Sequence, residues 1–269
     1  MKTVKLFFLW VIVSFSFFSC KAQQPKTFKE EFIPADTTVS ITQNSFSIDY
    51  LMGKFDPATH PDFVVIPALY RDEEIRYIRK DVLGAFIKMY DAAAQLGIYL
   101  KIRSATRNFE NQKRIWENKW TGRTILEDNV NAATQIHNDI DRAKKILQFS
   151  SMPGSSRHHW GTDIDINSFI NSWFESGEGL KLYEWMSTYA SKFGFCQPYT
   201  KQEIGGRTGY FEEKWHWSYM PVSGKLTAMA TEQLTNQMIS GFLGAETAKE
   251  IDVVKKYILG IGPSCLQSK

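Results

Sequence analysis

This chain of 269 residues has few cysteines and nearly balanced charges, and it has little in the way of long apolar runs or internal repeats. The apolar run at residues 6–18 is shorter than the roughly 20 residues that a membrane-spanning helix needs. Cys196 and Cys265 have no histidine close by in the sequence, which argues against a catalytic thiol. Without repeats or low-complexity tracts, a chain of this length and 43% hydrophobic content is expected to form one well-cored domain.

The first residues have the order of an export signal. Two lysines precede the apolar run, which ends in the letters FFSC at residues 17–20. This ending resembles the lipobox of bacterial lipoproteins, where a small residue precedes a cysteine that is acylated after cleavage, although Phe17 stands where leucine is usual. We expect residues 1–19 to be a signal peptide and residues 20–40 a polar tether. Cys20 would then anchor an exported lipoprotein to a membrane, facing the periplasm or the cell exterior. Plain secretion is the alternative.

Removal of the signal peptide changes both the charge and the cysteine count. It takes away two lysines and no acid, which leaves a net charge near +1 and no case for a nucleic-acid partner. An oxidising exterior permits Cys196 and Cys265 to form a disulfide. Sequence alone does not show whether their geometry allows it, so two free buried thiols are the alternative.

Spacing of apolar residues and of helix-capping residues divides the chain into elements. Residues 81–95 have helical spacing with Gly97 placed to end the helix, and Asn108 is suited to cap a second helix. We expect further helices at 136–149, 178–193, 225–242 and 245–258, and strands at 98–104, 162–167, 194–199 and 214–220. This order predicts an α+β domain over residues 41–222, in which helices flank a small, mostly antiparallel sheet, and a C-terminal helical extension over 223–269 packed on it.

The segment GSSRHHWGTDIDIN, residues 154–167, gathers groups that bind metals. A catalytic zinc site needs three protein ligands and an open position. His158 in the loop and Asp165 on the following strand approach one point, and His216 in EEKWHWSY is the best third candidate. Glu213, three residues before His216, is placed to act as a general base without binding the metal. The polar surroundings of His60 and His137 make both weak candidates.

Two motifs in this order, SRHHWGTDID at 156–165 and EKWH at 213–216, resemble the signature of the zinc D-alanyl-D-alanine carboxypeptidases of the VanY and VanX type, relatives of the hedgehog fold. Upstream, SATRNFENQ resembles the family's Ser-x-x-Arg element followed five residues later by Gln, and RTGY before the second motif also matches. The resemblance covers residues 80–220, the motif core of the expected zinc peptidase domain.

The resemblance implies a Zn²⁺ peptidase that removes the C-terminal D-amino acid from peptidoglycan stem peptides. It implies that zinc is bound by His158, Asp165 and His216. Glu213 would be the catalytic base. The remaining roles concern the substrate: Arg107 would stabilise the oxyanion or grip the peptide group, and Ser156 and Gln112 would contact the substrate. The same resemblance leaves open whether the cleaved bond is D,D or L,D.

Departures from the family pattern keep alternatives open. Asp163 stands where the family has a small apolar residue, and Thr106 where it has an aromatic one. Asp163 shares a strand face with Asp165, so it either orients a histidine or replaces Asp165 as ligand. His159 could replace His158, although packing is its expected role. Trp215 and Trp217 are expected in the core. Two rival functions are a peptidoglycan endopeptidase and an inactive zinc-stabilised binding module. A third alternative is that the cluster is only a polar turn and forms no metal site.

Overall fold

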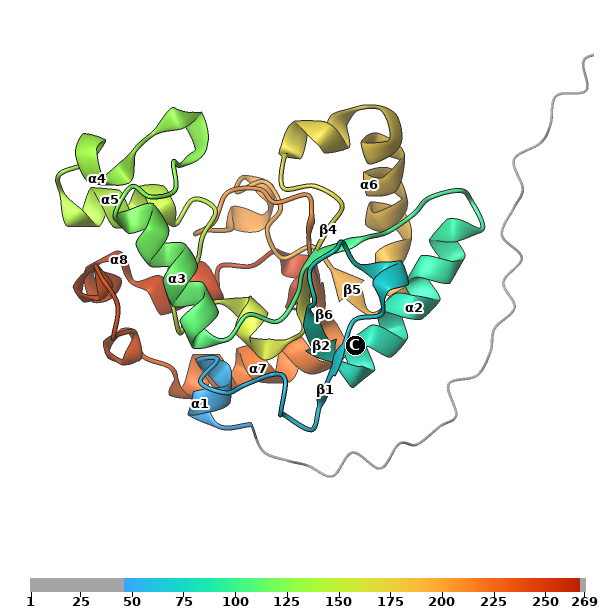
Figure 1. The fold of residues 1–269 in the computed structure, drawn as a ribbon, viewed down its shortest axis with the longest axis horizontal. Coiled ribbons are helices and arrows are strands. Elements are labelled where there is room, and N and C mark those ends of the chain that lie inside the picture. The colour runs from blue at the N-terminus through green and yellow to red at the C-terminus, as the bar shows by residue number, and fades with distance from the viewer. Residues whose placement is uncertain (1–45, 267–269) are drawn as a thin grey trace, which may run out of the picture. The chain divides into compact units, whose positions relative to one another are not determined.

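The computed structural model describes residues 46–266 (Figure 1), so the predicted signal peptide, Cys20 and the tether lie outside the described residues. None of the described helices is both long and apolar enough to cross a membrane. The helices are α1 (Ile48–Leu51), α2 (Lys80–Ala94), α3 (Phe109–Trp120), α4 (Ala132–Gln135), α5 (Asp139–Ile146), α6 (Gly177–Tyr189), α7 (Met220–Gln233) and α8 (Ala248–Ile251). The strands are β1 (Phe63–Val65), β2 (Tyr77–Arg79), β3 (Ile102–Ser104), β4 (Asp163–Ile166), β5 (Phe195–Cys196) and β6 (His216–Tyr219).

The α+β class with a small antiparallel sheet is confirmed. Four strands pair in the order β3-β4-β6-β5, and every neighbouring pair is antiparallel. Strands β1 and β2 form a separate antiparallel pair. In Figure 1, α2 and α6 lie on one side of the larger sheet, and α3, α4 and α5 lie on the other.

The two faces of the sheet differ because side chains alternate along a strand. Ile164 and Ile166 of β4 and Trp217 of β6 are buried in one hydrophobic cluster with residues of α2 and α6. The residues between them are polar and point to the opposite face. There Asp165 pairs directly with His216, and Asp163 with Ser218. Strands β4 (DIDI) and β6 (HWSY) therefore have an apolar face that packs on the helices and a polar face that carries Asp165 and His216.

Several predicted elements agree with the structure. Helix α2 lies within one residue of the predicted range, and Gly97 adopts a φ of 74° just after it. The Asn108 side chain accepts a hydrogen bond from the Asn111 amide at the start of α3. Helix α6 is prolonged by a 3-10 turn, Ala190–Phe193, which ends at Gly194 with a φ of 84°.

Other predicted elements were wrong in extent. Strand β3 has only three residues, and the helix expected over 136–149 begins at Asp139, where Asn138 caps it. Helix α7 starts earlier than predicted and ends at Gln233, before a stretch rich in β-branched and small polar residues that favour other conformations. The last predicted helix breaks at Asp252, whose φ is 61°.

The C-terminal segment packs on the rest of the described chain. Helix α7 runs without a break across residue 222, and Leu226 and Ala230 share a buried cluster with Tyr50 and Trp116. Cys196 and Cys265 are joined in a disulfide with a Cα–Cα distance of 5.6 Å, which resolves the two alternatives. The disulfide fixes the end of the described chain to β5.

Candidate metal centre and cleft

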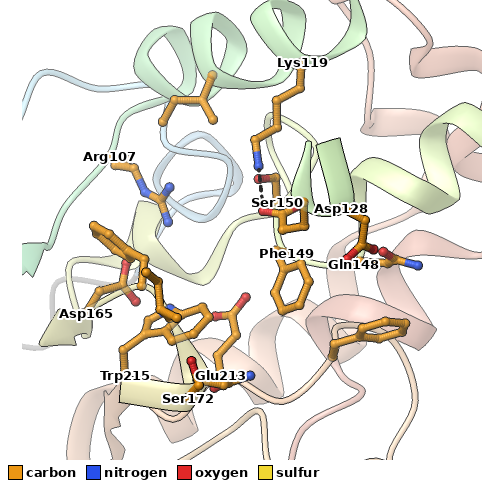
Figure 2. A pocket seen from close by; sticks show the side chains of 16 residues that line it. Arg107, Lys119, Asp128, Gln148, Phe149, Ser150, Asp165, Ser172, Glu213 and Trp215 are labelled. Carbon is orange, nitrogen blue, oxygen red and sulfur yellow. Dashed lines mark ion pairs between the residues drawn. The ribbon is translucent and has the colours of Figure 1, made fainter. Parts of the chain in front are cut away.

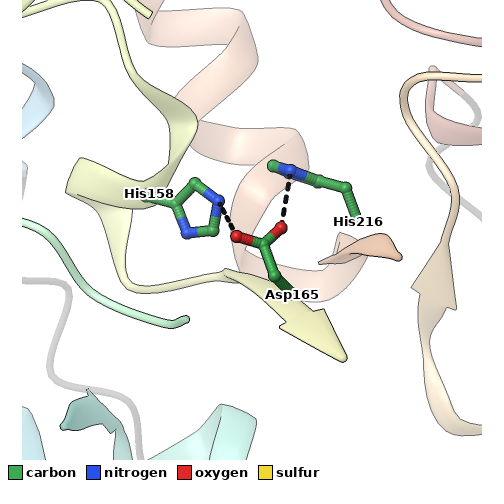
Figure 3. A group of neighbouring side chains, drawn as sticks. All are labelled: His158, Asp165 and His216. Carbon is green, nitrogen blue, oxygen red and sulfur yellow. Dashed lines mark ion pairs between the residues drawn. The ribbon is translucent and has the colours of Figure 1, made fainter. Parts of the chain in front are cut away.

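The three predicted metal ligands come together from two strands and one short turn (Figure 3). Asp165 and His216 face each other on β4 and β6, and His158 lies in the 3-10 turn Arg157–Trp160 just before β4. Gly161 has a φ of 71°, which turns the chain from His158 into β4, and a Cβ there would collide with the Phe63 ring. One ligand atom from each of the three side chains lies within 4.8 Å of the others.

Each histidine has one ring nitrogen held by an acceptor outside the cluster. His158 Nδ1 lies 2.8 Å from the Ala105 carbonyl oxygen, which can only accept, so Nδ1 carries the hydrogen and Nε2 faces Asp165 at 3.2 Å. His216 Nε2 lies 2.9 Å from Asp163 Oδ2, and its Nδ1 lies 3.2 Å from Asp165 Oδ1. Both rings therefore turn their second nitrogen toward the same carboxylate, as metal-binding histidines do.

The surroundings of the three side chains fit a cation. His158 Nε2 and Asp165 Oδ1 are buried without a hydrogen-bond partner, whereas buried polar atoms are normally paired. Burial lowers the pKa of His158 and so favours the neutral, ligating form of the ring. Burial opposes charge on His216 too, yet the carboxylates around it raise its pKa well above the usual range. Two imidazoles and one carboxylate are a donor set that suits zinc.

Glu213 and Arg107 lie beside the cluster and face the same cavity (Figure 2). Glu213 Oε2 lies 3.2 Å from His216 Nδ1, and burial raises the pKa of the Glu213 carboxyl. The Arg107 backbone amide donates to the His158 carbonyl at 3.1 Å, and its buried side-chain Nε has no partner. A buried carboxyl with a raised pKa and a guanidinium whose Nε has no hydrogen-bond partner thus lie next to the candidate metal position.

Two cavities meet at the metal cluster. The larger, of about 840 Å³, contains Asp165, Glu213 and Arg107, and the smaller, of about 460 Å³, shares Arg107 and Asp165 with it. Phe149, Phe211 and Trp215 form an aromatic wall of the larger cavity, with Phe149 and Phe211 in an edge-to-face contact. Trp215 and Trp217 are both buried in the core cluster, as expected, and Trp215 alone of the two also lines the cavity.

Some residues of this cleft escaped sequence reasoning. Lys119 of α3 reaches the larger cavity, where its Nζ lies 3.7 Å from Glu127 Oε1 and burial lowers its pKa (Figure 2). Phe149, Phe169 and Phe211 come from three separate loops. None of the four belongs to a local motif, so only the tertiary arrangement brings them to the site.

Two predicted substrate contacts lie behind the cavity surface. The Ser156 hydroxyl accepts a hydrogen bond from the His158 amide at 3.3 Å and is buried at the start of the turn. Gln112 Nε2 donates to the Ser151 carbonyl at 2.8 Å, and Gln112 Oε1 is buried without a partner. Neither residue lines either cavity. Ser156 caps the turn that carries His158, and Gln112 holds the loop before that turn. Contact of either residue with substrate stays a prediction.

His159 and Asp163, the alternative ligands, are both engaged elsewhere. His159 Nδ1 donates to the Arg107 carbonyl at 2.6 Å, and His159 Nε2 accepts from the Gly154 amide at 3.0 Å. Burial lowers the pKa of His159 to about 3, so the ring is neutral. Asp163 accepts from His216 on the side away from Asp165. The described residues therefore place His158 and Asp165, and neither alternative, in the ligand cluster.

Comparisons with known proteins give relatives over much of the chain. YodJ of Bacillus subtilis is 29% identical over 178 residues, which are 63% of this chain and 56% of that protein. A D-alanyl-D-alanine carboxypeptidase of Enterococcus faecalis is 29% identical over 137 residues, 50% of this chain and 45% of that protein. The chain thus spans about half the length of the curated relatives it matches.

Solved structures give looser matches. The LdcB LD-carboxypeptidase is 22% identical with a TM-score of 0.47, and the match covers 78% of this chain and 81% of that one. That structure is described as revealing the basis of peptidoglycan recognition. A zinc complex of the D,D-pentapeptidase VanY is 24% identical with a TM-score of 0.42, and the match covers 68% of this chain and 93% of that one.

The family itself is decided by the sequence match. The family model of VanY, described as D-alanyl-D-alanine carboxypeptidase, matches residues 75–222. This range is more than half of the chain and contains all three candidate ligands, Glu213 and Arg107. The chain belongs to the VanY family of D-alanyl-D-alanine carboxypeptidases.

Proposed function

We propose that this chain is a zinc-dependent carboxypeptidase that removes the C-terminal D-amino acid from peptidoglycan stem peptides. The observation that carries the proposal is a buried cluster of two histidines and one aspartate, which lies beside a buried glutamate and an arginine in one cleft. Family membership supports the reaction class.

The chain's own residues divide the work. His158 through Nε2, His216 through Nδ1 and Asp165 would hold the zinc ion, which when bound supplies a Lewis acid and lowers the pKa of water. Glu213 accepts the proton of the attacking water and then delivers it to the leaving amine. Burial raises the pKa of Glu213, which suits a group that must both accept and release a proton.

Arg107 is proposed to stabilise the charge that develops on the scissile carbonyl oxygen. The Arg107 backbone is fixed on both sides, because its amide donates to His158 and its carbonyl accepts from His159. A preorganised donor of this kind contributes about 3–4 kcal/mol to transition-state stabilisation. The presence of both Glu213 and Arg107 in the cleft also argues against the alternative of an inactive binding module.

The proposed reaction is tested by the product. The purified chain, loaded with zinc, should release free D-alanine from a synthetic stem pentapeptide or tetrapeptide, and chelation should abolish the release. Comparison of the two peptides decides between D,D and L,D cleavage. Zinc-loaded protein that releases no D-alanine from either peptide contradicts the proposal.

An endopeptidase is the second candidate, favoured by one observation. The two cavities share Arg107, Ile115, Asp165 and Phe169, so the candidate cleft continues past the metal position. Two adjoining cavities have room for a peptide that extends beyond the scissile bond. Mass spectrometry of products from a cross-linked dimer of stem peptides separates the candidates, because an endopeptidase yields two peptides without free D-alanine.

A lipid anchor at Cys20 is also proposed, on the sequence pattern alone. We expect the wild-type protein to fractionate with membranes, and Cys20→Ser to release it or to block its maturation. Stable attachment needs more than one acyl chain, since a single chain binds membranes only marginally. A wild-type protein found wholly in the soluble exported fraction contradicts the anchor.

A further inference from the structure

Asp163 is the residue of β4 that departs most from the family pattern, and its carboxylate is completely buried. It nevertheless accepts four hydrogen bonds. His216 Nε2 at 2.9 Å and Arg157 Nε at 3.1 Å donate to Oδ2. The hydroxyls of Thr162 and Ser218 each donate to Oδ1 at 2.7 Å. Every lone-pair direction of the carboxylate is thus engaged, which leaves no oxygen for a metal ion.

Arg157 supplies the charge that balances Asp163. Its guanidinium is 1% exposed and donates to the hydroxyls of Ser218 at 2.9 Å and Thr227 at 3.0 Å, as well as to Asp163. It also lies 4.5 Å from the centre of the Trp160 ring. An unpaired charge in such a place is very costly. Removing either charge alone should therefore destabilise the folded chain.

The position of the pair relative to the cluster gives it a role. Arg157 directly precedes His158, and Asp163 lies two residues before Asp165 on the same face of β4. Asp163 holds the Nε2 hydrogen of His216, so the opposite nitrogen, Nδ1, must face Asp165. A carboxylate that binds the far side of a metal-ligating histidine fixes the ring and raises its basicity.

We propose that Asp163 is a positioning residue for the metal site, which orients His216 through Nε2, and that Arg157 balances the buried charge of Asp163. The inference rests on the proposed function, because it takes His158, Asp165 and His216 as the zinc ligands. Through Thr227, the same network connects helix α7 to the metal centre.

Zinc affinity separates positioning from packing. Asp163→Ala should weaken zinc binding by about 10- to 100-fold, the usual effect of losing such a partner. Asp163→Asn keeps an acceptor for His216 and should lose less. Arg157→Met should bind zinc nearly as wild type, because Asp163 still accepts from His216. Thr227→Val, a near-isosteric change at the far end of the network, is the matched control and should leave the affinity unchanged.

Thermal unfolding of the zinc-free proteins tests the charge balance. Arg157→Met should lower the unfolding temperature more than the double variant Asp163→Ala/Arg157→Met, because the single change leaves a buried carboxylate unpaired. The double variant should nonetheless bind zinc as weakly as Asp163→Ala. If Asp163→Ala does not fold, the double variant and Asp163→Asn give the same comparison.

The outcomes distinguish the inference from the proposed function. A wild-type chain that binds zinc and releases D-alanine, with unchanged zinc affinity in the folded Asp163 variants, overturns the positioning role alone. Zinc affinity that falls only in proportion to loss of folded protein assigns the pair to packing and overturns it as well. A wild-type chain that binds no zinc overturns both. Chelator competition on the full chain gives the affinity in each case.

Discussion

Glu213→Gln should bind zinc like the wild-type chain and release almost no D-alanine. Glutamine keeps the shape of the side chain and one carbonyl oxygen, but it cannot accept the proton of the attacking water. General acid–base catalysis contributes about 10²- to 10⁴-fold. Glu213 is assigned both proton transfers, so the loss should reach the upper end of that range. Turnover of a stem peptide and zinc content of the same preparation are the two measurements.

The structure supplies a matched control for this variant. Glu212 is the neighbouring carboxylate, is more exposed than Glu213, and lines neither cavity. Glu212→Gln should therefore keep both zinc and turnover. If Glu213→Gln turned over at a near-normal rate, the base would lie elsewhere, with Glu212 the first residue to test. If Glu213→Gln lost zinc, Glu213 would be a ligand. Glu213 Oε2 lies 3.2 Å from His216 Nδ1, so the zinc content of this variant tests that possibility.

The candidate ligands could be predicted from sequence because they depend on local geometry. His158 and Asp165 are seven residues apart across one turn and one strand, and the alternation of DIDI decides which residues share a face. His216 follows the same rule on β6. The helices with clear periodicity and a capping residue, α2 and α3, were also predictable.

The remaining features depend on contacts between distant segments. The aromatic wall of the cleft joins loops more than 60 residues apart, such as Phe149 and Phe211. The partner of Asp163 is Arg157, a surface-type residue that no periodicity marks as buried. Likewise, the break at Asp252 is held by a hydrogen bond from the Asn236 side chain, which local propensity does not reveal.

The adjacent histidines should respond differently to removal of the ring. His158→Ala should lose stoichiometric zinc and, with it, D-alanine release, because the cluster then keeps only two ligands. His159→Ala should keep zinc and at least part of the activity. Both residues are buried, at 2% and 0% exposure, so the two variants remove the same side chain from equally enclosed positions. Metal content of the purified proteins is the decisive measurement.

The structure gives the physical reason for the difference. His158 uses Nδ1 to bind the Ala105 carbonyl and turns Nε2 toward Asp165, at 3.2 Å. His159 commits both nitrogens to the backbone, at Arg107 and Gly154, and therefore has none for a metal. Its loss should loosen the Arg107 loop and lower turnover while the ligand cluster stays intact. Equal zinc loss in the two variants would contradict the assignment of His158, and zinc loss in His159→Ala alone would exchange the two roles.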